Sequence, residues 1–320
     1  MTSAPLSRER VVRVARRVRR PGLPGAIARL EFPLRAPTVP GAVVPVPEPE
    51  RLGAHYDTDW ARTFPARWAR AVLLEAALRP MVRAVADPER RGYDRLAGLD
   101  GPVIFAANHH SHVDAGLLLT SLPEPWRYRV FAGAAADYFF ANRFTATVSA
   151  LALGAIPIER SEVTRRSADQ AAELIDDGWS MVIFPEGGRS PDGWGQRFRG
   201  GAAYLSIRCG VPVVPVHLEG TGRILPKGTS KVKPGRTRVT FGVPLRPEEG
   251  ETSRRFAARV EHAVAALADE VTGDWYTARQ RAHGGESPPL TGPTSAGWRR
   301  AWALGDRRGR PRPKRRWPEL

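Results

Sequence analysis

The sequence predicts an α/β protein in which helices flank a β-sheet. Between residues 101 and 272, short apolar runs alternate with longer amphipathic segments, which is the pattern of strands and helices in such a sheet. Apolar residues make up 42% of the chain, which is enough for a hydrophobic core. The apolar runs lead into polar or glycine-containing motifs, as expected where loops at strand ends carry a functional site. The 320 residues can hold one large domain with appendages or two small ones.

Each apolar run and each amphipathic segment predicts one element. Strands are expected at 103–106, 128–132, 181–184, 213–218 and 237–241. Helices are expected at 115–121, 144–152, 163–177, 200–208 and 252–271. A tight turn followed by a further short strand is expected within 154–160.

The first part of the chain is expected to lie outside the sheet. Residues 1–55 are predicted to hold a short basic helix at 7–20 and a flexible proline-rich linker, partly disordered. The span 60–86 is predicted to be helical and partly amphipathic, with Pro80 kinking or splitting it. Two interpretations of this span stay open: a helix packed on the core domain, or a helix lying on a membrane surface.

The last part of the chain, residues 273–320, is predicted to be a disordered tail because it is polar and rich in proline and glycine. It ends in a basic run that contains tryptophans. Such a tail could be simply solvated, could contact anionic lipid, or could bind nucleic acid. No nucleic-acid-binding signature accompanies it, so no specific nucleic-acid partner is expected.

The net charge indicates which binding partners the protein favours, and the cysteine content indicates its cellular compartment. With 49 Lys+Arg against 33 Asp+Glu the formal charge is +16, which favours anionic partners: membrane lipid, nucleic acid or phosphorylated substrates. The single cysteine, Cys209, excludes a disulfide within the chain and a multi-cysteine zinc site, and indicates a reducing compartment. We find neither an apolar run long enough for a transmembrane helix nor a secretory signal, so a cytoplasmic location is expected.

The most informative motif is the stretch 108–114, Asn-His-His-Ser-His-Val-Asp, which follows the apolar run 102–107. It places His109 five positions before Asp114 at the end of a predicted strand. An imidazole beside a carboxylate can take a proton, while the carboxylate fixes its tautomer and stabilises the imidazolium. Because the attacking hydroxyl can belong to the substrate, this pair indicates transfer chemistry onto an alcohol.

Three further motifs follow. Residues 154–160 offer a turn, a short strand and Arg160 at its end. Residues 184–190, Phe-Pro-Glu-Gly-Gly-Arg-Ser, end a strand with glycines that let backbone N–H groups approach a ligand, and supply Arg189 for a phosphate. Residues 211–221 form an apolar strand that could wall an acyl pocket.

These four motifs in series resemble those of the lysophospholipid acyltransferase family, whose bacterial members include the 1-acyl-glycerol-3-phosphate acyltransferases. The resemblance covers roughly residues 60–270 and rests on His-x4-Asp, Gly-x-Ile-x-Ile-x-Arg, Phe-Pro-Glu-Gly-x-Arg-Ser and Val-Pro-Val-Val-Pro-Val. It implies a mixed β-sheet flanked by helices, in an acyltransferase domain at 56–272. It also implies that the N-terminal helices at 60–86 face a membrane.

The resemblance further implies a role for each matched residue. His109 would be the general base that deprotonates the acceptor hydroxyl, and Asp114 would orient it. The residues expected on the phosphate side of the acceptor are Arg160, Glu186, Gly187, Arg189 and Arg199. The acyl donor would be acyl-CoA or acyl-carrier protein, with no metal or prosthetic group, and the acceptor would be lysophosphatidic acid or a related lysophospholipid at the inner face of the cell membrane.

Two departures from the family pattern leave the identity of the acceptor open. Gly188 stands where a threonine is common, and Pro157 stands where a bulky apolar residue is more frequent. Both leave the arginines of the two motifs in place.

Two other functions fit parts of the sequence. His110, His112 and Asp114 also match the His-x-His-x-Asp pattern of zinc hydrolases, although Ala115 stands where that pattern continues with a histidine. A non-enzymatic lipid- or nucleic-acid-binding protein on an acyltransferase scaffold is the second alternative. The intact His109–Asp114 pair argues against it.

Overall fold

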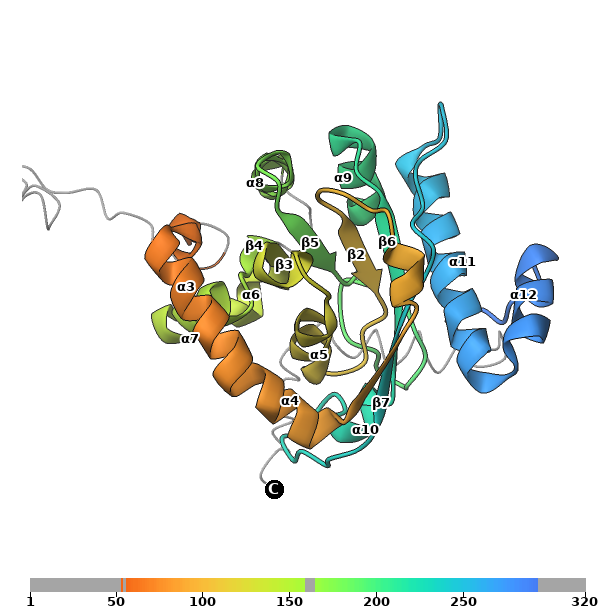
Figure 1. Ribbon diagram of the computed structural model, residues 1–320, viewed down its shortest axis with the longest axis horizontal. Coiled ribbons are helices and arrows are strands. Elements are labelled where there is room, and N and C mark those ends of the chain that lie inside the picture. The colour runs from red at the N-terminus through yellow and green to blue at the C-terminus, as the bar shows by residue number, and fades with distance from the viewer. Residues whose placement is uncertain (1–52, 54–55, 159–164, 293–320) are drawn as a thin grey trace, which may run out of the picture. The chain divides into compact units, whose positions relative to one another are not determined.

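The structure is a computed structural model that describes residues 53, 56–158 and 165–292. In this part of the chain the strands form one seven-stranded sheet of order β1-β7-β6-β2-β5-β3-β4 (Figure 1). The strands are β1 (Pro88–Arg91), β2 (Ile104–Ala107), β3 (Val130–Ala135), β4 (Ile156–Ile158), β5 (Ser180–Ile183), β6 (Val213–Glu219) and β7 (Thr237–Phe241). All neighbouring strands are parallel except β6 and β7, so the sheet is mixed, as expected.

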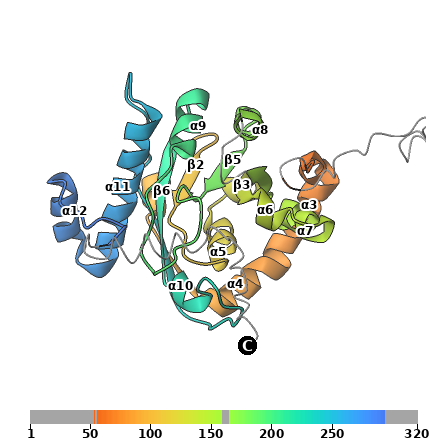
Figure 2. The ribbon, with the colours of Figure 1, turned by 180° about the vertical axis from the view of Figure 1, so that it is seen from behind.

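Helices cover both faces of the sheet (Figures 1 and 2). They are α3 (Phe64–Leu73), α4 (Arg79–Ala86), α5 (Val113–Ser121), α6 (Ala136–Phe139), α7 (Arg143–Ala152), α8 (Arg165–Asp176), α9 (Gly201–Cys209), α10 (Thr221–Ile224), α11 (Ser253–Thr272) and α12 (Trp275–His283). One face carries α4 and α5, and the opposite face carries α8, α9 and α11.

Each face of the sheet has its own hydrophobic core. On β2, Phe105 packs with the leucines of α5, whereas its neighbour Ile104 packs with residues of α8, α9 and α11. The split follows from the alternation of side chains along a strand. Because both faces of the central strands are buried, their sequences read as continuous apolar runs, which is why the runs at β2, β5 and β6 could be recognised.

The expected strands and helices of residues 103–272 are confirmed, with ends that move by at most three residues. The strand expected at 128–132 begins later, at Val130, because Trp126–Tyr128 form a short 3-10 helix. Strand β1 was not expected. Its sequence, Pro-Glu-Arg-Arg, is polar because it lies at the edge of the sheet, where it pairs only with β7 and alternates between half-buried and exposed residues.

The span 60–86 is helical, and a π-helical turn at Leu74–Leu78 joins α3 to α4. Pro80 lies inside a helical run that is continuous from Phe64 to Ala86, directly after the wider π-turn that can accommodate its ring and its missing N–H. Val82 and Ala86 belong to the core below α4, as the packed-helix interpretation requires. The membrane interpretation stays a prediction. No helix in the described residues is long and apolar enough to cross a membrane.

The structure corrects the expected boundary of a disordered tail at residue 273. Residues 275–283 form α12, whose first turn is capped by the Asp274 side chain accepting from the Thr277 N–H. Arg281 holds α12 on α11 through two bonds to Asp269, both of 2.7 Å. The helix was missed because ion pairs rather than a long apolar stripe attach it to the domain. The predictions for residues 1–52 and 293–320 lie outside the described residues.

Candidate active site

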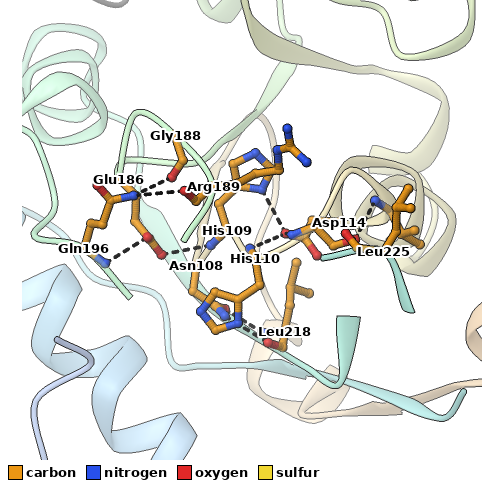
Figure 3. A network of polar contacts seen from close by, with 12 residues as sticks. Asn108, His109, His110, Asp114, Glu186, Gly188, Arg189, Gln196, Leu218 and Leu225 are labelled. Carbon is orange, nitrogen blue, oxygen red and sulfur yellow. Dashed lines mark hydrogen bonds and ion pairs between the residues drawn. The ribbon is translucent and has the colours of Figure 1, made fainter. Parts of the chain in front are cut away.

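The motifs at 108–114 and 184–190 meet at the carboxyl ends of two central strands of the sheet (Figure 3). They follow β2 and β5, which are parallel neighbours, so their carboxyl ends lie side by side. The backbone N–H of Ser190 donates to the carbonyl of His109 at 2.8 Å and ties the two loops together. We call the side of the sheet where the parallel strands end its carboxyl edge. This is the side on which an α/β sheet presents its functional loops.

His109 and Asp114 are in direct contact. Nδ1 of His109 lies 2.8 Å from Oδ2 of Asp114, and the Asp114 side chain is fully buried at the start of α5. The same oxygen accepts the backbone N–H groups of His110 at 2.6 Å and Ser111 at 2.7 Å. The tight turn that begins α5 therefore folds around this carboxylate, and the carboxylate cannot swing away from the imidazole.

The orientation of His109 is also fixed from its ring face. The imidazole stacks on Phe184 with ring centroids 4.3 Å apart and planes inclined by 21°. Its side chain stays 19% exposed. When Nδ1–H donates to the Asp114 carboxylate, the lone pair is on Nε2, the nitrogen that can accept a proton from a bound molecule.

Glu186 links the two loops. It is 3% exposed, and its Oε1 accepts the backbone N–H of His109 at 2.8 Å. Its Oε2 accepts the backbone N–H of Gln196, also at 2.8 Å. The Gln196 side chain in turn donates to the carbonyls of Gly188 at 2.9 Å and Arg189 at 3.4 Å. Sequence reasoning did not identify Gln196, since a single glutamine in a loop carries no pattern.

Gly187 and Arg199 pack against each other. Gly187 has a φ of +70°, and a Cβ there would lie 2.9 Å from Cζ of the Arg199 guanidinium. The backbone N–H of Arg199 donates to the carbonyl of Pro185 at 2.9 Å, which brings this arginine back to the loop after β5. Arg189 precedes Ser190, the residue bonded to His109, so both arginines belong to loops at this edge.

Arg160 lies outside the described residues. The strand that leads to it, β4, runs parallel to β3, which is itself parallel to β5. The carboxyl end of β4 therefore points to the same edge of the sheet as the loops after β2 and β5.

Two histidines near the site have lowered pKa values. Burial, as the largest cause, lowers the pKa of His110. Burial likewise lowers the pKa of His217 to about 3, with smaller contributions from His110 and Arg238. Nε2 of His110 and Nδ1 of His217 have no hydrogen-bond partner. His112 instead stacks on Tyr138, and its Nε2 lies 3.2 Å from the tyrosine hydroxyl.

The residues of the zinc-hydrolase pattern do not assemble a ligand set. In the described residues, no three His, Cys, Asp or Glu side chains are placed to hold a metal ion. Oδ2 of Asp114 is engaged by the His109 ring and by two backbone N–H groups.

The sequence and fold of this chain are similar to those of known acyltransferases. The family model described as Acyltransferase matches residues 85–219, a range that contains every candidate site residue. This part of the chain, less than half of its 320 residues, is therefore similar to the acyltransferase family. The matched range runs from the end of α4 to the end of β6, so it includes both loops that form the site.

Individual acyltransferases are similar to parts of this chain. The chloroplastic 1-acyl-sn-glycerol-3-phosphate acyltransferase BAT2 of Brassica napus is 33% identical over 162 residues, which cover 48% of this chain and 44% of that protein. The 1-acyl-sn-glycerol-3-phosphate acyltransferase of Pseudomonas aeruginosa is 34% identical over 117 residues, which cover 36% of this chain and 45% of that protein. The chain spans about half the length of the curated relatives it matches.

A solved structure has the same fold. The 1-acyl-sn-glycerophosphate acyltransferase PlsC from Thermotoga maritima aligns with a TM-score of 0.53 and 23% identity. The alignment covers 69% of this chain and 85% of that chain.

Proposed function

We propose that this protein is an O-acyltransferase that moves a fatty acyl group from acyl-CoA or acyl-carrier protein to the free hydroxyl of a lysophospholipid. The observation that carries the proposal is the 2.8 Å contact between His109 Nδ1 and a buried Asp114 at the carboxyl edge of the sheet. The names of the relatives, all 1-acyl-sn-glycerol-3-phosphate acyltransferases, support lysophosphatidic acid as the acceptor.

The reaction uses the His109–Asp114 pair as follows. Nε2 of His109 takes the proton of the acceptor hydroxyl while that oxygen forms a bond to the thioester carbonyl carbon. The C–S bond then breaks, and the leaving thiolate receives the proton from the imidazolium. The Asp114 carboxylate stabilises the imidazolium between the two transfers, and general-base catalysis of this kind contributes roughly 100- to 10,000-fold in rate. The acyl donor is the only cosubstrate that the proposal includes.

The acceptor's phosphate binds on the side of the loop after β5. Arg189 and Arg199 supply guanidinium groups, which can each donate two parallel hydrogen bonds to a phosphate. At Gly188, where a Cβ would meet nothing within 4 Å, the backbone has room to approach the same anion. Arg160 is included because its motif matches the family and β4 points to this edge.

The acceptor reaches the site from a membrane. On α3 the exposed side chains Phe64, Trp68 and Val72 follow each other at four-residue spacing and therefore share one face. Helix α7, which packs beside α3, adds exposed Phe144 and Val148. We call these five exposed residues the apolar patch. Such a patch, in a chain of formal charge +16, suits peripheral binding to anionic lipid at the inner face of the cell membrane.

The direct test is the product. Purified protein is incubated with palmitoyl-CoA and lysophosphatidic acid in mixed micelles, and lipids are identified by mass spectrometry. Phosphatidic acid carrying the palmitoyl chain is the expected product. The proposal is contradicted if neither acyl-CoA nor acyl-carrier-protein donors give any diacylated product with a panel of lysophospholipids.

A further inference from the structure

The segment that follows α12, residues 284–292, lies against the loop next to the candidate site. We call this segment the C-terminal strap. The backbone N–H of Gly195 donates to the carbonyl of Leu290 at 2.9 Å. Gly292 lies so close to the Trp194 ring that a Cβ on the glycine would come within 2.4 Å of Cδ2. The strap and the loop are therefore in tight contact at two successive loop residues.

The same stretch of loop holds the candidate site on its other side. Gln196 follows Trp194 and Gly195, and its backbone N–H donates to Glu186 at 2.8 Å. Its side-chain amide donates to the Gly188 carbonyl at 2.9 Å (Figure 3). Glu186 in turn accepts the backbone N–H of His109 at 2.8 Å. A continuous series of contacts thus leads from the strap to the general base.

The strap is attached to a long helix. Arg281 of α12 makes its two bonds to Asp269 of α11, whose side chain is 4% exposed. The N–H of Glu286, in the strap, donates to the carbonyl of Arg281 at 2.8 Å. Helix α11 also holds the loop directly, because Glu261 accepts the N–H of Phe198 at 2.8 Å. The strap lies beyond residue 219, where the match to the family model ends.

We propose that Trp194 and Gln196 are positioning residues for acyl transfer, and that the C-terminal strap holds them in place. This inference rests on the proposed function. Residues 184–200 contain no helix or strand, so their backbone is placed by contacts with the rest of the protein. The strap holds the loop at Trp194 and Gly195. The hydrogen bonds of Gln196 to Glu186 and Gly188 then hold these two residues in place. The acceptor's phosphate then meets Arg189 in a constant geometry.

Two glycines of the strap allow a matched test. Gly292 and Gly285 both have a φ of +73°, so alanine brings the same backbone strain at either position. A Cβ at Gly292 collides with Trp194, whereas a Cβ at Gly285 has nothing within 4 Å. We expect Gly292→Ala to lower kcat/KM for lysophosphatidic acid by roughly 10- to 100-fold, since a shift of about 1 Å at a site can cost that much. Most of the change should be a higher acceptor KM, with the donor KM unchanged, and Gly285→Ala should keep the wild-type values.

A second pair of variants avoids backbone strain. Gln196→Ala removes the amide that holds the Gly188 carbonyl and should raise the acceptor KM in the same way. Gln280→Ala, at an exposed position on α12, is its control.

A Trp194→Phe variant, which keeps an aromatic ring against Gly292, should retain more activity than Trp194→Ala.

Amide hydrogen exchange separates this inference from the proposed function. The Gly195 amide should exchange slowly in the wild type and in Gly285→Ala, and fast in Gly292→Ala. If the protein shows that exchange pattern but transfers no acyl group, the proposed function fails and the strap contact stands. The positioning role is overturned if Gly292→Ala exchanges fast at Gly195 yet keeps the wild-type kcat/KM. The strap contact is overturned if the wild-type Gly195 amide is unprotected.

Discussion

Glu186 holds the backbone of His109: its Oε1 accepts the His109 N–H at 2.8 Å, while the imidazole of the same residue contacts Asp114. Two carboxylates thus fix one histidine: Glu186, in the loop after β5, through its main chain, and Asp114, at the start of α5, through its ring. This relationship explains why the Pro-Glu-Gly motif and the His-x4-Asp motif occur together: each completes the other's geometry.

Replacing Asp114 with asparagine should reduce kcat by roughly 100- to 10,000-fold, because the amide cannot stabilise the imidazolium as a carboxylate does. Steady-state kinetics of Asp114→Asn would measure the effect, with Asp100→Asn at an exposed position as the control. Wild-type turnover by Asp114→Asn would show that the pair does not act as a catalytic unit.

Adjacent glycines in the loop after β5 should respond differently to alanine. Gly187→Ala places a Cβ 2.9 Å from the Arg199 guanidinium at a positive φ, so it should raise the acceptor KM and destabilise the fold by about 1 kcal/mol or more. Gly188→Ala meets nothing within 4 Å and should be tolerated. Urea unfolding and acceptor titration of both variants would check this, and equal effects would contradict the assigned contact.

The stability of the protein should fall in mild acid because of His217. Burial lowers its folded pKa to about 3, while the unfolded chain titrates near the ordinary histidine value of about 6.5. The unfolded state therefore binds more protons between these values, so stability is fully present above the unfolded pKa and is lost as the pH falls below it. At about 1.36 kcal/mol per pH unit, unfolding at pH 5 should cost up to about 2 kcal/mol less than at pH 7.

Urea unfolding of His217→Asn at both pH values provides the comparison. The variant should lose most of this pH dependence, whereas His283→Asn, at an exposed position on α12, should keep it. An unchanged pH dependence in His217→Asn would assign the effect to other groups. His110, whose pKa is also lowered by burial, would then be the first to test.

The apolar patch on α3 and α7 should be required for membrane binding. Trp68→Glu and Phe144→Glu each place a charge where an apolar side chain would enter the headgroup region. Losing one such burial, about 1.5–3 kcal/mol, should weaken binding to anionic vesicles by roughly 10- to 100-fold. Vesicle co-sedimentation would measure the affinity, with Tyr276→Glu, 65% exposed on α12, as the control. Equal binding by all three variants would place the membrane contact elsewhere.

Much of the fold could be predicted from the sequence because the central strands are buried on both faces. The runs that became β2, β5 and β6 are apolar except for Ser180 at the start of β5 and for His217 and Glu219 near the end of β6, and the helices between them are amphipathic. Edge strand β1 and helix α12 were missed for the same physical reason: both are held by backbone pairing or ion pairs, as between Arg281 and Asp269, which leave no apolar pattern.

Only part of the candidate site could be predicted from the sequence. The proximity of His109 and Asp114 follows from their spacing after a strand. The bonds of Glu186 to His109 and Gln196 do not, because they depend on which strands are neighbours in the sheet. The contact between Gly292 and Trp194 joins residues that are almost a hundred positions apart and has no local signal.

Thiol release from palmitoyl-CoA, measured with and without lysophosphatidic acid for wild type and His109→Ala, tests the role of His109 as the general base. Circular dichroism and thermal unfolding would establish that the variant is folded, and His262→Ala, at an exposed position on α11, is the matched control. We expect acceptor-dependent release by the wild type and by His262→Ala, and a loss of roughly 100- to 10,000-fold in folded His109→Ala. Wild-type release by folded His109→Ala, or release that does not depend on the acceptor, would contradict this role.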